Sequence, residues 1–398
     1  MTTTGGVIIL YCIVTVVAVV TKRFRVPYTA ALLLIGVLVG GLHLVDLPRL
    51  TKELLFAIFL PGLLFEAAYH LKPRELRENA WAIVTLAVPG VAITIGLIAM
   101  FLVAGSAVLG TEGVLWSTGL IFGAVIAATD PVAVTALFRE VAAPRRLHVL
   151  VESESLFNDG TSIVFLTLLL AYFAGDAPTT ASLFVAFVRI AGGGALIGLA
   201  VGWAISHVRT RLDDAAIEIT LTTIAAYGAF ALAEQFHFSG VIATVCAGVI
   251  CGHLGRTSPM TAGTHAAVNG FWEWLAFALN SAVFLLLGAE ISAIFLLREW
   301  KLVLLGALSA LVARSIVVFL ASLGLHRTKE RIPPAWGAIL VWGGLRGALS
   351  LVLALALPLE THNRTLIVAL TAGTVMLSLV GQGGSMPRLL RRLNLKGD

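Results

Sequence analysis

The sequence predicts an all-α protein that crosses a membrane about thirteen times, and three observations support this fold class. Of the 398 residues, 59% are hydrophobic and 12% are charged, with a mean hydropathy of +0.97. A water-soluble fold of this composition would expose too much apolar surface. The apolar residues form long runs, and Lys and Arg gather in alternate connecting segments, as in multi-pass membrane proteins.

The excess of basic over acidic residues gives a pI of about 9.3. It follows from the Lys- and Arg-rich loops and does not indicate a nucleic-acid partner. The three cysteines, Cys12, Cys246 and Cys251, lack the spacing of a metal site. They also lack the paired pattern of the disulfide-bonded cysteines in secreted proteins. No disulfide, zinc site or cofactor is predicted. The first apolar run lacks a basic segment before it and a cleavage pattern after it, so we expect a retained helix.

A membrane span needs about 20 mainly apolar residues. By that measure, spans are expected at 6–21, 27–43, 51–68, 81–104, 114–138, 149–173, 181–207, 214–235, 239–254, 266–297, 301–325, 333–357 and 363–386. The loops after the odd-numbered spans and the tail at 387–398 hold most of the Lys and Arg residues. The other face holds only Arg49, Lys52, Arg298, Lys301 and Arg364. This sorting predicts a cytoplasmic C-terminus and an outside N-terminus.

The fifth span carries an acidic residue beside a proline, in Thr129-Asp130-Pro131. Pro131 lacks an N–H and disfavours helical geometry for Asp130. It suits the first position of a new helix, for which Asp130 is a good N-cap. We therefore expect two half-helices, with the carboxylate near the positive end of the second. Backbone N–H and C=O groups that lose their helical hydrogen bonds near the middle of the membrane must line a cavity or be buried in protein.

The twelfth span has a comparable weakness at Trp342-Gly343-Gly344-Leu345-Arg346-Gly347. Spans five and twelve are seven apart, an odd offset, so spans 1–6 and 8–13 would form two inverted six-helix repeats. The two breaks then occupy matching positions, as expected for transporters with a midplane site. The alternative is that these glycines only allow close helix packing.

The sixth span carries a polar stripe. Ser155 and Asp159 are four residues apart, as are Glu154 and Asn158. On an α-helix these spacings place the two pairs in adjacent rows on one side. In a membrane that side must face protein, and the broken fifth span is the expected partner.

Together these residues indicate a cation site built from oxygen atoms. Asp159, Asp130, the Thr129 and Ser155 hydroxyls and a freed carbonyl would suit a hard cation such as Na⁺. A carboxylate that holds either a proton or a metal ion forces the two to compete. If only the loaded forms change access, cation and proton must move in opposite directions. The sequence therefore predicts secondary active transport rather than an enzyme.

Two basic residues also lie within predicted spans. Arg314 and Arg346 are intramembrane cations that need acidic partners. Glu66 and Glu154 are the candidates near span interiors, and the sequence leaves open which of them serves Arg346.

Several segments resemble the signatures of a known family. Ala128-Thr129-Asp130-Pro131-Val132-Ala133, Glu154-Ser155-Leu156-Phe157-Asn158-Asp159-Gly160 and Gly343-Gly344-Leu345-Arg346-Gly347-Ala348 are similar to motifs of the monovalent cation:proton antiporters, in the NhaP/NHE branch. The segment Phe59-Leu60-Pro61-Gly62-Leu63-Leu64-Phe65-Glu66 is similar to the third-span motif of that branch, where a second proline is more usual than Gly62. The resemblance covers essentially the whole membrane part.

The resemblance implies a single antiporter domain over 1–398 that forms a homodimer in lipid of the cell membrane. A core transport part, spans 4–6 and 11–13 at about 81–173 and 301–386, would move against an interface part, spans 1–3 and 7–10 at about 6–68 and 181–297. The implied ion- and proton-binding residues are Asp159, Asp130, Thr129, Ser155 and Glu154. The implied stabilising contacts are Asn158 on the unwound segment, a Glu154–Arg314 ion pair, and Arg346 at the half-helix ends, with Glu66 as its candidate partner.

The resemblance also bears on stoichiometry. Electrogenic relatives have Asp where this chain has Asn158. This chain therefore has one titrating carboxylate fewer, which predicts electroneutral exchange of one Na⁺ or Li⁺ for one H⁺. A K⁺/H⁺ antiporter would use the same machinery, because cation preference depends on cavity size and ligand field. A passive cation channel and an intramembrane aspartyl protease are remoter alternatives.

Overall fold

The computed structural model describes residues 3–24, 27–42, 51–111, 114–141, 143–175, 180–209, 213–257, 261–291 and 298–393. These residues form helices and no strand, which confirms the predicted all-α class. The helices are α1 (Thr3–Phe24), α2 (Tyr28–Gly41), α3 (Lys52–Leu54), η1 (Leu55–Phe59), α4 (Leu60–His70), α5 (Pro73–Glu78), α6 (Ala80–Ala87), α7 (Pro89–Val108), α8 (Trp116–Ala127), α9 (Val132–Glu140), α10 (Arg145–Ala174), α11 (Thr180–Arg209), α12 (Ala215–Gln235), α13 (Gly240–Thr257), α14 (Ala262–Glu290), α16 (Trp300–Leu325), α17 (Pro334–Trp342), α18 (Ala348–Leu355), α19 (Arg364–Leu377), η2 (Ser378–Gly383) and α20 (Gly384–Leu393).

Each predicted span coincides with helix in the described part of the chain. The end of the tenth predicted span, 292–297, and the end of the predicted tail, 394–398, lie outside the described residues. Among the described residues, seven helical segments are long and apolar enough to cross a membrane on their own, and others are shorter or broken. The count of thirteen crossings therefore stays a prediction.

The chain divides into two compact units. The first comprises residues 1–52, 81–158 and 281–398, and the second comprises 53–80 and 159–280. Helix α10 belongs to the first unit up to Asn158 and to the second from Asp159 onward. The expected division into core and interface parts concerns movement and dimerisation, which a single copy does not display, so it stays a prediction.

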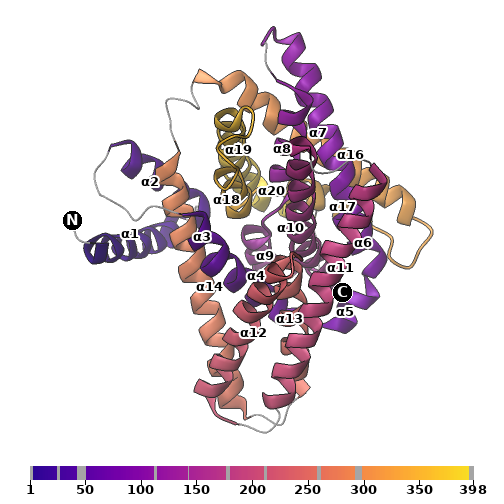
Figure 1. The fold of residues 1–398 in the computed structure, drawn as a ribbon. Helices are drawn as coiled ribbons and strands as arrows, with labels where there is room; N and C mark the ends of the chain where they lie inside the picture. The colour runs from indigo at the N-terminus through magenta and orange to yellow at the C-terminus, as the bar shows by residue number, and fades with distance from the viewer. Residues whose placement is uncertain are drawn as a thin grey trace. The chain divides into compact units, whose positions relative to one another are not determined.

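In the second unit, α13 packs against α4, α11 and α12 (Figure 1). The contact with α11 is close because a Cβ on Gly198 would lie 2.1 Å from the Ala243 carbonyl oxygen, a position that only glycine tolerates. The rings of Phe65 and Trp272 pack in a tilted arrangement with centroids 4.6 Å apart, and the Trp272 indole donates a hydrogen bond to Thr222. These buried contacts form the core of this unit.

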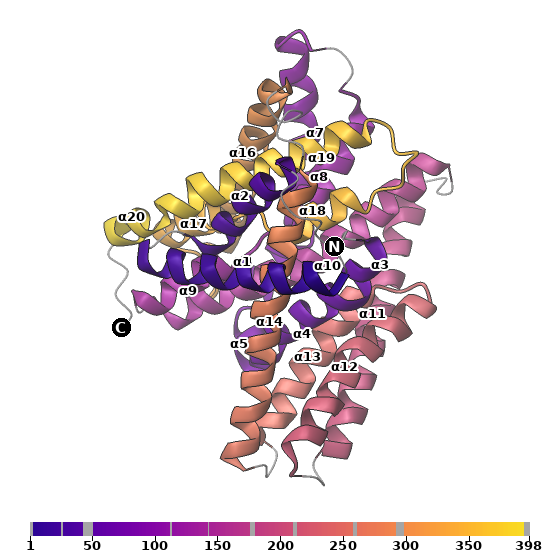
Figure 2. The same cartoon turned by 90° about the vertical axis from the view of Figure 1, so that its left-hand side faces the viewer.

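In the first unit, α7 packs against α8 and α16, and α19 packs against α8, α16 and α18. Helix α7 begins at Pro89, which has no N–H to donate and therefore separates it from α6. Figure 2 shows α19, η2 and α20 as one continuous run, coloured yellow. The η2 segment is a π-helical turn, a local widening that often accompanies functional sites.

Candidate functional site

The first break lies where the sequence predicts it. Helix α8 ends at Ala127, and α9 begins at Val132. The Asp130 carboxylate accepts a hydrogen bond at 3.0 Å from the amide of Val132, the first residue of α9. Pro131, and not Asp130 as predicted, occupies the N-cap position, so α9 begins one residue later than expected and Asp130 lies just before the cap.

The second break separates α17 from α18 and contacts the first. The Asp130 amide donates to the Leu345 carbonyl at 2.7 Å. A Cβ on Gly347 would lie 2.6 Å from Asp130 Oδ2, so a larger residue at this position would displace the carboxylate. Gly347 is therefore needed for this close approach of the two breaks, so the close packing expected of the glycines occurs here between the break and Asp130.

Arg346 lies at the end of α8 with 3% of its surface exposed. Its Nη1 donates to the carbonyls of Ala127 at 3.0 Å and Ala128 at 3.3 Å. These carbonyls lack helical partners because the helix stops there, and they carry the negative end of its dipole. The Arg346 backbone amide donates to the Ser378 hydroxyl of η2 at 3.1 Å.

The expected partner of Arg346, Glu66, belongs to the second unit. Its carboxylate lies 3.5 Å from His70 Nδ1, one turn later on α4. A Glu66–Arg346 pair stays a prediction, and the described contacts of Arg346 are to backbone carbonyls and to Ser378.

The polar stripe of α10 binds the unwound segment of the first break. The Ser155 hydroxyl donates to the Thr129 carbonyl at 2.5 Å. The Asn158 amide nitrogen donates to the Thr129 hydroxyl at 2.8 Å and to Glu154 at 2.9 Å, and its oxygen accepts from the Thr129 amide at 3.4 Å. Two turns of α10 thus fix the backbone and side chain of Thr129 in a region where helical hydrogen bonds are missing.

The ion pair between Glu154 and Arg314 is present. Arg314 donates from Nη1 and Nη2 to the two oxygens of Glu154, at 2.8 and 2.9 Å. The same guanidinium donates to the Leu340 carbonyl near the end of α17. With 2% of Glu154 and 6% of Arg314 exposed, the pair is buried, and its bidentate geometry offsets the cost of desolvating both charges.

Asp159 follows Asn158 directly on α10 and is partly buried. Because α10 is continuous, Asp159 lies one helical turn after Ser155, on the row that the sequence predicts. The Thr129 and Ser155 hydroxyls retain acceptor lone pairs beside their described hydrogen bonds, so both could serve as neutral oxygen ligands. Na⁺ binding by Asp159, Asp130, Thr129 and Ser155 stays a prediction.

The structure adds groups that sequence reasoning missed. The carbonyls of Ala127, Ala128, Leu340 and Leu345 accept the bonds that hold the breaks, and carbonyls have no sequence signature. Ser378 did carry a signal, as one of three hydroxyl residues, with Thr371 and Thr374, at helical spacing in an apolar span.

Comparisons with known proteins agree with this architecture. A family model described as sodium/hydrogen exchanger, transmembrane, matches residues 8–392. The chain is 37% identical over 384 residues to the Na⁺/H⁺ antiporter ApNhaP of Aphanothece halophytica, covering 95% of this chain and 72% of the relative. It is 36% identical over 408 residues to the Na⁺/H⁺ antiporter NhaP of Pseudomonas aeruginosa, covering 95% and 94%.

The fold is similar to that of a solved structure. The sodium proton antiporter MjNhaP1 of Methanocaldococcus jannaschii at pH 8 superposes with a TM-score of 0.82, at 21% identity and with 99% of each chain covered. This similarity confirms the predicted antiporter fold.

Proposed function

The chain belongs to the transmembrane sodium/hydrogen exchanger family, and on that basis we propose that it exchanges Na⁺ for H⁺, with Asp159 as the carboxylate for which they compete. The relatives reported above are named for Na⁺/H⁺ antiport, which favours sodium over the K⁺/H⁺ alternative. A passive channel and an intramembrane protease are not favoured either.

The observation that carries this proposal is the bonding of α10 to the first break. Ser155 and Asn158 hold Thr129 by hydrogen bonds to its carbonyl and its hydroxyl. The next residue of the same helix is Asp159. A carboxylate that follows such a fixed segment is positioned with little freedom to adapt, as a selective cation site requires.

The bonding also supports electroneutral exchange. Asn158 is an amide that does not titrate, and both atoms of its side-chain head are engaged. The Glu154 charge is matched by Arg314 in a bidentate pair, and the Asp130 carboxylate accepts a hydrogen bond from the Val132 amide at the start of α9. Asp159 then remains the carboxylate that can take up a proton when Na⁺ leaves. One proton moves for each cation, and no net charge crosses.

Alternating access and assembly complete the proposal. The core part, spans 4–6 and 11–13, carries the site across, and the interface part, spans 1–3 and 7–10, joins two copies in a cell membrane. The excess of Lys and Arg in alternate loops supports a cytoplasmic C-terminus.

The test is a pH-gradient dequenching assay in proteoliposomes, with Na⁺, Li⁺ and K⁺ titrated in turn. We expect the parent to exchange Na⁺ and Li⁺, and Asp159→Asn to lose exchange while it folds and inserts like the parent. Glu78→Gln is the matched control, because its carboxylate is exposed and pairs only with Arg74 in the described contacts. Full exchange by Asp159→Asn would refute the site.

The electroneutral stoichiometry is tested separately, by the dependence of the exchange rate on membrane potential. The initial rate of the parent should not change when a potassium diffusion potential of either sign is imposed with valinomycin. A rate that rises with one sign and falls with the other would contradict one-for-one exchange while leaving the antiport activity itself intact.

A further inference from the structure

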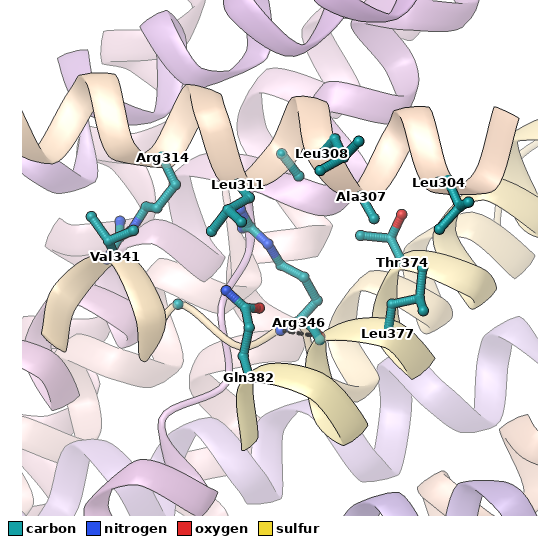
Figure 3. A pocket seen from close by; sticks show the side chains of 13 residues that line it. Leu304, Ala307, Leu308, Leu311, Arg314, Val341, Arg346, Thr374, Leu377 and Gln382 are labelled. Atoms are coloured by element: carbon teal, nitrogen blue, oxygen red, sulfur yellow. Dashed lines mark hydrogen bonds between the residues drawn. The ribbon is translucent and has the colours of Figure 1, made fainter. Parts of the chain in front are cut away.

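A cavity in the first unit is not used by the proposed exchange mechanism. It has a volume of about 190 Å³ and lies between α16, α19, η2 and the break that joins α17 to α18. Its α16 wall is formed by Leu304, Leu308 and Leu311, and its opposite wall includes Thr374 and Leu377. Figure 3 shows the Arg346 side chain rising from the break toward α16, beside Leu311 and Gln382.

The walls of this cavity are largely apolar and partly exposed. The Leu308 side chain is 58% exposed and that of Leu377 is 42% exposed. In a chain that spans a membrane, exposed leucines on α16 and α19 face hydrocarbon. For the proposal below we take this opening to face the bilayer interior.

The inner end of the cavity is cationic. In the described part of the chain, the side-chain hydrogen bonds of Arg346 all come from Nη1, so Nε and Nη2 keep donors for a ligand. No carboxylate of the described first unit lies within ion-pair distance of this guanidinium, whereas Arg314 has Glu154. The Thr374 hydroxyl, on the wall, is buried and has no hydrogen-bond partner among the described residues.

From these contacts we propose that the cavity binds a long-chain monocarboxylic acid of the fatty-acid class. The carboxylate binds Arg346, and the alkyl chain runs past Leu311 and Leu308 into the bilayer. A planar carboxylate matches the free edge of a guanidinium, and a charge-assisted hydrogen bond is strong where water is excluded. The volume equals about six water-sized groups, which accommodates the headgroup and the first methylenes.

Two other anions fit the site less well. An inorganic ion such as chloride would have to cross hydrocarbon to reach a lateral opening, whereas a fatty acid already resides in the bilayer. A phospholipid phosphate stays at headgroup level. Arg314, on the same wall, lies about 20 Å along α16 from its start at Trp300, well within a hydrocarbon core about 30 Å thick.

The test uses the purified full-length protein in detergent with cis-parinaric acid as a fluorescent probe. Oleate, oleyl alcohol, chloride and inorganic phosphate are added as competitors. We expect oleate to displace the probe about tenfold or more better than oleyl alcohol, as one charge-assisted hydrogen bond provides. Chloride and phosphate should leave the probe bound.

A variant pair locates the site. Ala307→Trp fills the cavity from α16 and should weaken oleate binding about tenfold or more, since the lost contacts are those of the chain. Leu320→Trp, on the same helix and exposed outside the cavity, should bind like the parent. Equal displacement by acid and alcohol, displacement by chloride or phosphate, or parental binding by a folded Ala307→Trp would each overturn the proposal. If Ala307→Trp does not fold, the relative displacement of the probe from the parent by oleate and by oleyl alcohol still tests the proposal.

Discussion

The buried ion pair between Glu154 and Arg314 gives a prediction whose size can be worked from the structure. Arg314→Gln removes both hydrogen bonds to Glu154 and both bonds to the Leu340 carbonyl. Glu154 then keeps the Asn158 amide as its remaining described donor, at a position 2% exposed. Leaving a buried charge unpaired costs about 3–5 kcal/mol, so we expect a large loss of stability.

The double variant separates charge from packing. Replacing Glu154 as well, in Glu154→Gln with Arg314→Gln, removes the unpaired charge and allows the two amides to hydrogen bond. The double variant should therefore recover half or more of the loss, which is about 1.5–2.5 kcal/mol or more. Unfolding in detergent, followed as the fraction of monodisperse protein against temperature, measures both variants beside the parent. A double variant no more stable than Arg314→Gln would refute the reasoning, because burial of an unpaired Glu154 charge would then not be the source of the loss.

Three further predictions concern the site and one loop. Asn158→Asp adds a titratable group beside the break, so exchange should become sensitive to an imposed membrane potential, and an unchanged rate under valinomycin would count against the stoichiometry argument. Gly347→Ala places a Cβ 2.6 Å from Asp130 Oδ2, so Na⁺/H⁺ exchange should fall about tenfold or more, with about 1–3 kcal/mol of stability lost by overpacking; parental transport would contradict the contact. Hydrogen bonds from the Thr264 hydroxyl and from Thr261 lower the pKa of Asp213. Their stabilisation is present above the unfolded pKa of about 3.9 and is lost as pH falls through the lower folded value. The difference in melting temperature between the parent and Asp213→Asn should therefore vanish at strongly acid pH, and a constant difference would refute it.

Much of the fold could be predicted from the sequence because the membrane imposes few choices. A run of apolar residues must be helical there, since backbone groups find no water. Pro131 and the Gly343-Gly344 pair then show where a helix cannot continue, and the structure breaks both helices at those places.

The bonds between the breaks could not be predicted in the same way. Asp130 was expected at the N-cap of a half-helix, but it lies one residue before the cap, where its carboxylate accepts from the Val132 amide and its own amide donates to the Leu345 carbonyl. Likewise, Arg346 was expected at the half-helix ends, while its bonds to Ala127 and Ala128 depend on how the two segments cross. The identity of a residue indicates which hydrogen bonds its side chain can make. These contacts use backbone atoms, which every residue has, so the sequence does not indicate them.

The number of membrane crossings and the ligands of Asp159 could not be predicted for a different reason. Short and broken helices such as α8 and α18 cross a membrane only as parts of pairs, so length and composition alone do not fix the number of crossings. Asp159 has a predictable row on α10, but which oxygen atoms meet its carboxylate depends on side-chain and backbone positions that no sequence spacing records.

Competition between Na⁺ and H⁺ at Asp159 is the central claim, and the pH dependence of Na⁺ affinity tests it most directly. The measurement is the half-saturating Na⁺ concentration for exchange in proteoliposomes, taken across a series of pH values equal on both sides. If one carboxylate holds either ion, that concentration should rise about tenfold for each pH unit below the pKa of the site, while the maximal rate at saturating Na⁺ changes little. A half-saturating concentration that stays constant while the maximal rate changes would contradict the account, because proton and cation would then act at separate groups.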